Sequence, residues 1–230
     1  MPTRVHDRRD AAIARKIVAA WSGVPASVAA DIFGGHTLVD PAIRPLRPFA
    51  PGQRLVGPAV TAFCTGTDYG AVHHAIAVAT AGDVIVVAAG GRENPAIIGE
   101  LLSGSARLKG VAGVVVDGAV RDSGRLRQWE DFVVFTRHVN PRGPSSMDHG
   151  IVNDVITFGG ARVAPGDLIL GDDDGLVVIP REEAKERLAA CQARVQAERG
   201  WEEELLKGRT TLDVFNVPAA GSGGAARDDT

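Results

Sequence analysis

The chain has 230 residues, of which 45% are hydrophobic, and its 25 basic and 28 acidic residues give a formal net charge of -3. This length can bury a full core, so we expect one domain over residues 1–218, and the lack of a basic excess argues against a nucleic-acid partner. No apolar run approaches the roughly 20 residues of a membrane span, and the Arg- and Asp-rich start differs from a signal peptide, so we expect a cytoplasmic protein without a membrane partner.

The first part of the chain alternates helices and strands. Predicted helices cover residues 10–22, 26–33 and 69–80, and predicted strands cover 54–64 and 83–88. The first of these helices rests on Ile13, Ile17 and Trp21, which recur at helical spacing. The two cysteines, Cys64 and Cys191, have no partners at metal-binding spacing, so we expect buried, unreactive thiols in a reducing compartment.

The most informative stretch runs from residue 99 to residue 122. Glu100 stands at the start of a predicted helix, and the Val-rich run 111–116 is typical of a strand buried on both faces. Asp117-Gly118 is then expected to turn the chain, and Arg121-Asp122 follows. Helix N-termini and the C-terminal ends of strands are the places where α/β sheets bind ligands, so this stretch is the candidate site.

The second half of the chain is richer in strands. After a short helix that reaches Trp129, predicted strands cover residues 132–139, 155–158, 161–163, 168–170 and 176–179, and a long helix covers 181–206. Residues 219–230 consist mainly of Gly, Ala, Ser and charged residues, and we expect them to be disordered. Alternating elements first and clustered strands later predict an α/β fold with a mixed sheet and helices on its faces.

The separation of Glu100 from Arg121-Asp122 resembles the signature of the RraA-like family. That family holds the divalent-metal-dependent 4-hydroxy-4-methyl-2-oxoglutarate aldolases, which also act as oxaloacetate decarboxylases, and the regulators of ribonuclease E activity. Other segments that resemble the family are Pro-Ala-Val-Thr at 58–61, Ala-Gly-Asp at 81–83, Val-Ala-Pro-Gly-Asp at 163–167 and Gly-Asp-Asp-Asp-Gly at 171–175. The resemblance implies a layered β/β/α fold of the phosphohistidine or swivelling type, assembled as homotrimers or hexamers.

The chemistry of such a lyase suits these residue types. Retro-aldol cleavage or decarboxylation of a 2-oxo acid leaves a pyruvate enolate, whose developing oxyanion must be stabilised. Mg²⁺ or Mn²⁺ held by carboxylates does this, and an arginine adds charge and bidentate geometry for the substrate carboxylate. By resemblance, Asp122 is the direct metal ligand, Glu100 acts as a second acid through metal-bound water, and Arg121 contacts the pyruvyl carboxylate and carbonyl.

Further positions complete the site that the resemblance implies. The start of the signature helix, at Gly99, Leu101 and Leu102, would bind the same substrate carboxylate through backbone N–H groups that have no partner within the helix. Family aldolases also use a glutamate from the C-terminal helix of a neighbouring subunit. In this chain Glu198 is the candidate for that acid, and Glu202 is the second choice.

The expected function is therefore a metal-dependent lyase that releases pyruvate from 4-hydroxy-4-methyl-2-oxoglutarate or 4-carboxy-4-hydroxy-2-oxoadipate and decarboxylates oxaloacetate. The alternative is a non-catalytic regulator that binds an RNA-degrading enzyme, since fold alone does not separate the two. A Schiff-base mechanism is disfavoured, because none of the four lysines suits a desolvated, imine-forming position. Many family members have an acid in the loop where this chain has Arg-Glu-Asn at 92–94. This departure would change which substrate tail is accepted.

Each of these features also has a structural interpretation. Glu100 can serve only to stabilise the helix dipole, and the Arg-Asp pair can be a surface ion pair. Asp172–Asp174 lacks the alternating spacing of a calcium loop and favours a hairpin turn. His73 and His74 are adjacent and therefore lie on different helix faces, so one of them can line the pocket, and a structural histidine is an equally good interpretation.

Overall fold

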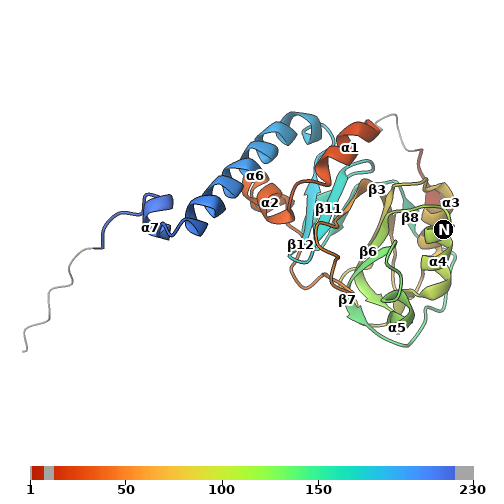
Figure 1. The fold of residues 1–230 in the computed structure, drawn as a ribbon. Helices are drawn as coiled ribbons and strands as arrows, with labels where there is room; N and C mark the ends of the chain where they lie inside the picture. The colour runs from red at the N-terminus through yellow and green to blue at the C-terminus, as the bar shows by residue number, and fades with distance from the viewer. Residues whose placement is uncertain (1, 8–12, 221–230) are drawn as a thin grey trace, which may run out of the picture. The chain divides into compact units, whose positions relative to one another are not determined.

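Four parallel strands form the centre of the fold (Figure 1). A computed structural model describes residues 2–7 and 13–220, and its central strands lie in the order β3 (Leu55–Phe63), β4 (Val84–Ala88), β6 (Gly113–Val120) and β7 (Val133–Val139). All residues of β4 and β6 are buried, as expected for parallel strands covered on both faces. The strands predicted at 54–64, 83–88 and 132–139 are thus confirmed.

Shorter strands extend the centre into one large mixed sheet. They are β1 (Arg4–Val5), β2 (Arg44–Pro45), β5 (Ala96–Ile98), β8 (Ile151–Val152), β11 (Leu168–Asp172) and β12 (Gly175–Ile179). A separate antiparallel pair consists of β9 (Ile156–Phe158) and β10 (Ala161–Val163). The predicted hairpin at Asp172–Asp174 is confirmed, because Asp172 pairs with Gly175 across a two-residue turn between β11 and β12.

The helices are α1 (Arg15–Trp21), α2 (Ala26–Phe33), α3 (Gly70–Val78), α4 (Glu100–Leu108), α5 (Ser123–Leu126), α6 (Ala184–Leu206) and α7 (Thr211–Val214), with a 3₁₀ turn at Gly35–Thr37. The helix predicted at 10–22 is described from residue 13 onward, and its first part lies outside the described residues. In the described part of the chain, no helix is long and apolar enough to cross a membrane.

Two apolar clusters cover the two faces of the central strands. On one face, Val60, Ile85 and Val114 belong to a cluster that also contains residues of α3 and α4. On the other face, residues of the same strands pack with β9, β10, β11 and β12. Cys64 and Cys191 are buried free thiols, as predicted, and burial raises the pKa of Cys64 to about 12.

The chain divides into two units, Met1–Gln192 and Ala193–Thr230. The first contains the sheets and the candidate site. In the second, the rings of Trp201 and Phe215 meet edge to face at 5.2 Å, and Thr210 and Asp213 form a capping box at the start of α7. Most of the tail predicted to be disordered, residues 221–230, lies outside the described residues.

The prediction that Asp117-Gly118 turns the chain is wrong. Both residues lie inside β6, where residues 117–118 together face the single residue 137 of β7, so the dipeptide forms a bulge. The Asp117 carboxylate accepts bonds from Arg137 Nε at 2.8 Å and from the Gly159 N–H at 3.0 Å. These bonds to Asp117 allow β6 to continue to Val120, so Arg121-Asp122 follows the end of β6 directly.

Candidate functional site

A cavity of about 300 Å³ opens beside the C-terminal end of β6 and the first turn of α4. It is lined by Tyr69, His73, Ala96, Ile97, Ile98, Gly99, Leu101, Leu102, Arg121 and Pro144. Four residues predicted for substrate binding or catalysis, Gly99, Leu101, Leu102 and Arg121, therefore meet around one cavity. Most of its lining residues are apolar and its polar side chains are few, which is the usual composition of a small-molecule site.

Arg121 is held at the cavity by its backbone and by two glycines. Its N–H donates to the Ile98 carbonyl at 3.0 Å, which fixes the residue against β5. A Cβ added at Gly99 would lie 2.7 Å from Arg121 Cγ, and one at Gly143 would lie 2.3 Å from Arg121 Nη1. Only glycine at these two positions allows the arginine side chain to occupy this place.

Asp122 connects the end of β6 to the start of α4. Its backbone is left-handed, with φ of 57°, a conformation that aspartate tolerates better than most residues. Its Oδ2 accepts the Glu100 N–H at 2.9 Å and lies 3.6 Å from Arg121 Nε. No described residue bonds to its Oδ1, so one carboxylate oxygen stays open beside the cavity.

The first turn of α4 offers unpaired donors and a second carboxylate. Gly99 is the N-cap and supplies no side-chain cap, so the N–H groups of Leu101 and Leu102 have no partner within the helix. Glu100 is half-exposed, and its Oε1 accepts from Arg125 Nε at 3.1 Å. Its other carboxylate oxygen makes no hydrogen bond to a described residue.

Asp122 and Glu100 fit a hard divalent cation. Both are carboxylates with one open oxygen each, the Asp122 side chain is tied to the Glu100 backbone by the bond between Oδ2 and the N–H, and both side chains are about half-exposed. Mg²⁺ and Mn²⁺ prefer few carboxylates together with water, so this sparse pair of oxygen donors suits either ion.

The part of the cavity lined by α3 was not predicted as a unit. Tyr69 and His73 lie one helical turn apart at the start of α3, and their rings contact each other with centroids 4.8 Å apart. His73 lines the cavity, whereas His74 does not, so of the two adjacent histidines the first is the pocket residue. Pro144 comes from the loop after β7. This loop is separated in sequence from the stretch 99–122, so the contact was not predicted.

Asp68 anchors that loop to α3. Its carboxylate accepts the Gly70 N–H and the Asp148 N–H at 2.8 Å each and the Ser146 hydroxyl, and it lies 3.3 Å from His149 Nδ1. Burial alone would raise the pKa of Asp68, but the accepted bonds from Ser146 and the backbone outweigh it and hold the pKa well below its usual range. An Asp just before a predicted helix is the sequence signal that could have indicated this anchor, but we did not predict it.

The oxygen and nitrogen atoms of Asp68, Asp148 and His149 are also close enough to hold a metal ion. However, the Asp68 oxygens already accept several hydrogen bonds from the chain itself, so its lone pairs are committed to the loop. We therefore assign this group a structural role, and the open oxygens of Asp122 and Glu100 are the better donors for a cation.

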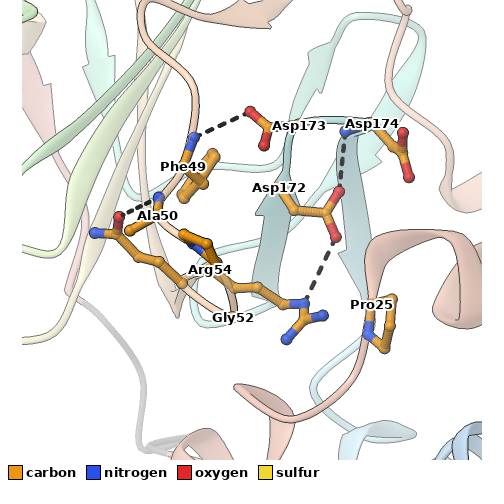
Figure 2. A pocket seen from close by; sticks show the side chains of 10 residues that line it. Pro25, Phe49, Ala50, Gly52, Arg54, Asp172, Asp173 and Asp174 are labelled. Atoms are coloured by element: carbon orange, nitrogen blue, oxygen red, sulfur yellow. Dashed lines mark hydrogen bonds and ion pairs between the residues drawn. The ribbon is translucent and has the colours of Figure 1, made fainter.

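A larger cavity, of about 420 Å³, lies where the β11–β12 hairpin meets residues 49–54 (Figure 2). Its aspartates are occupied by the fold: Asp173 accepts the Phe49 N–H at 3.1 Å, and Asp172 accepts the Asp174 N–H at 3.1 Å and pairs with Arg54 at 3.6 Å (Figure 2). Of these two cavities, the smaller one combines an arginine with backbone N–H groups that have no partner within their helix, so it is the candidate site.

The two glutamates predicted to act from a neighbouring subunit lie in the unit Ala193–Thr230. Glu198 Oε1 accepts from Arg194 Nε at 2.9 Å within α6, and Arg194 stacks over the Trp201 ring at 4.9 Å. Glu202 is exposed. Their role at a site remains a prediction.

Comparison with known proteins gives consistent matches. The family model "RraA-like: Aldolase/RraA" matches residues 7–178. A protein of Halalkalibacterium halodurans named "Putative 4-hydroxy-4-methyl-2-oxoglutarate aldolase" is 36% identical over 181 residues, which are 76% of this chain and 84% of that protein.

Solved structures agree in fold. A structure of an uncharacterized protein from Pseudomonas syringae pv. tomato covers 89% of this chain and 98% of its own, with a TM-score of 0.75 and 24% identity. Streptomyces coelicolor RraAS2, described as an unusual member of the RNase ES inhibitor RraA protein family, covers 82% of this chain and 98% of its own, with a TM-score of 0.72 and 26% identity.

Proposed function

Because this chain belongs to the RraA-like family, we propose that it is a divalent-metal-dependent lyase that releases pyruvate from a 4-hydroxy-2-oxo dicarboxylic acid. The substrates would be 4-hydroxy-4-methyl-2-oxoglutarate or 4-carboxy-4-hydroxy-2-oxoadipate, with decarboxylation of oxaloacetate as a second activity. The observation that carries the proposal is the cavity lined both by Arg121 and by the first turn of α4, whose N–H groups have no partner within the helix, with two open carboxylates beside it.

In this proposal the chain's residues bind and orient the pyruvyl half of the substrate. The Leu101 and Leu102 N–H groups donate to its carboxylate, and the positive end of the α4 dipole favours the same negative charge. Arg121 donates to the carboxylate and to the 2-oxo oxygen, on which negative charge develops as the carbon–carbon bond breaks. The apolar side chains of Ile97 and Ile98 exclude water from this half of the site.

Asp122 would hold the cation through its open oxygen, and Glu100 would orient water around it. Bound Mg²⁺ or Mn²⁺ supplies the positive charge that lowers the barrier to forming the oxyanion. Asp122 also keeps the first turn of α4 in place through its bond to the Glu100 N–H. The same residue thus aligns the amide donors with the metal position.

The direct test is a pyruvate-release assay on the two hydroxy acids and on oxaloacetate, with and without added Mg²⁺ or Mn²⁺. We expect metal-dependent release from at least one of the hydroxy acids. If no substrate yields pyruvate with either metal, the lyase proposal fails.

The second candidate is a regulator that binds an RNA-processing enzyme, and the similarity to RraAS2 favours it. Such a role needs a partner-binding surface and no catalytic cavity. It predicts that the chain inhibits a ribonuclease of the RNase E type in a cleavage assay, and that Arg121→Ala leaves this inhibition unchanged.

We propose further that the protein is a homotrimer or a dimer of trimers, with the phosphohistidine or swivelling type of layering and with active sites at subunit boundaries. The unit Ala193–Thr230 supports this, because several of its large apolar side chains are exposed. They are Leu205, Leu206, Leu212, Phe215 and Val217. A second copy of the chain would cover them and bring Glu198 to a neighbouring site.

Assembly can be tested by complementation. Chains carrying Arg121→Ala and chains carrying Glu198→Ala should each be inactive, yet equal amounts refolded together should recover about a quarter of wild-type activity, because one boundary in four joins two intact halves. Glu186→Ala, which removes another exposed acid of α6, is the matched control and should stay active. Full activity in a monomer, or no recovery on mixing two inactive variants, contradicts the shared site.

A further inference from the structure

The cavity contains three titratable side chains on its walls, Tyr69, His73 and Arg121. A retro-aldol reaction needs a group that handles a proton, because the hydroxyl on carbon 4 must lose its proton and carbon 3 must gain one. Arginine stays protonated in proteins, and an ordinary tyrosine gives up its proton only near pH 10. Histidine is the side-chain type that exchanges a proton between pH 5 and 8.

His73 is held in place by its own helix. It lies four residues after Tyr69, on the same helical face, and its ring rests against the tyrosine ring at 4.8 Å. Tyr69 is in turn fixed, since its N–H donates to the Ser146 carbonyl at 3.0 Å and the preceding Asp68 anchors the same loop. No described residue forms a hydrogen bond with the His73 ring, so neither ring nitrogen is committed to a partner among the described residues.

The position of His73 also fits a site in which different elements would bind the two halves of the substrate. Arg121, the α4 amides and the two open carboxylates lie at the ends of β6 and α4, where the pyruvyl half would bind. His73 comes from α3, which is a different element that lines the same cavity. The half of the substrate that carries the hydroxyl would therefore meet α3.

Resting on the proposed function, we propose that His73 is the acid–base residue of the retro-aldol step. Its neutral ring accepts the proton of the hydroxyl on carbon 4, and the carbon 3–carbon 4 bond breaks as carbon 4 becomes a keto group. The bonding electrons pass to the 2-oxo oxygen beside Arg121. The His73 ring then returns the proton to carbon 3, which gives pyruvate, so one proton moves from oxygen to carbon and no oxidant or reductant is needed.

The adjacent histidine supplies a matched control. His73→Gln and His74→Gln remove the same ring from neighbouring exposed positions of α3, and only His73 lines the cavity. We expect His73→Gln to lower kcat for retro-aldol cleavage about a hundredfold or more, the usual contribution of a general acid–base group, with KM nearly unchanged. His74→Gln should keep wild-type kcat, and both variants should melt at the wild-type temperature.

Three further readouts separate proton transfer from a structural effect. Oxaloacetate loses carbon dioxide without any hydroxyl deprotonation, so its consumption should fall much less in His73→Gln than hydroxy-acid cleavage does. In His73→Gln, the exchange of pyruvate methyl protons in D₂O, measured by NMR, should slow in parallel with retro-aldol cleavage. Added imidazole should restore part of the retro-aldol rate in His73→Ala.

The outcomes distinguish this inference from the proposed function. If wild-type protein shows no pyruvate release and no methyl exchange, the lyase proposal itself fails. If wild-type protein is active and His73→Gln cleaves the hydroxy acid within threefold of His74→Gln, the assignment of His73 is overturned while the lyase proposal stands. Equal losses in cleavage and in oxaloacetate consumption would likewise overturn it, because they would indicate damaged substrate binding.

Discussion

Replacing Asp122 with alanine should reduce metal-dependent pyruvate release to the background rate. The variant loses the carboxylate oxygen that is open beside the cavity, and also the acceptor for the Glu100 N–H. Without that anion the proposed site loses its direct ligand for the cation, so the charge on the developing oxyanion would not be balanced. The measurement is the initial rate of pyruvate release at saturating Mg²⁺ or Mn²⁺.

Asp122→Asn separates the two roles of the residue. The amide oxygen can still accept the Glu100 N–H, so the first turn of α4 and the melting temperature should be preserved, yet the negative charge is gone and activity should stay at background. Asp131→Ala removes an exposed acid that pairs with Arg107 at 2.8 Å and does not line the cavity, and it should remain active. Wild-type activity that survives exhaustive chelation would contradict the metal assignment altogether.

The central sheet and the first half of the site could be predicted from sequence because their signals are local. Val-rich runs indicate strands buried on both faces. The positions of the site residues follow from these elements: Glu100 starts a helix, and Arg121-Asp122 follows a strand. One helix and one strand separate Glu100 from Arg121-Asp122, so the start of that helix and the end of that strand lie close together. Four predicted residues accordingly line one cavity.

The bulge in β6 could not be predicted in this way. Asp117-Gly118 is a dipeptide typical of turns, and local preference alone favours reversal of the chain. The competing interactions come from Arg137 on β7 and from the Gly159 N–H before β10, both remote in sequence. Burying the carboxylate with these partners makes extended backbone the better state.

The wall formed by α3 was missed for a related reason. Pro144 and Tyr69 meet at the cavity because Asp68 accepts bonds from Ser146 and from the Asp148 N–H, a contact between segments about 80 residues apart in the chain. A helical period shows that His73 and His74 face different ways, but it does not show which of them faces a site. That choice is set by tertiary packing.

Replacing Arg121 with lysine should lower turnover by about a hundredfold or more, comparable to the loss of one oxyanion donor. Lysine keeps the positive charge but loses the planar fork that can bind the substrate carboxylate and the 2-oxo oxygen together. Because the oxyanion interaction strengthens as the bond breaks, kcat should fall more than KM rises. Steady-state kinetics on the best hydroxy-acid substrate measure both constants.

Arg107→Lys is the matched control for this substitution. Arg107 lies in the last turn of α4, pairs with Asp131 and stacks over Trp129, and does not line the cavity, so its replacement should leave kcat unchanged. The packing around Arg121 also favours a specific role for it, since a Cβ added at Gly99 or Gly143 would come within 3 Å of its side chain. A near-normal rate for Arg121→Lys would mean that these glycines serve packing around a structural arginine, and the oxyanion would then need another donor among the α4 amides.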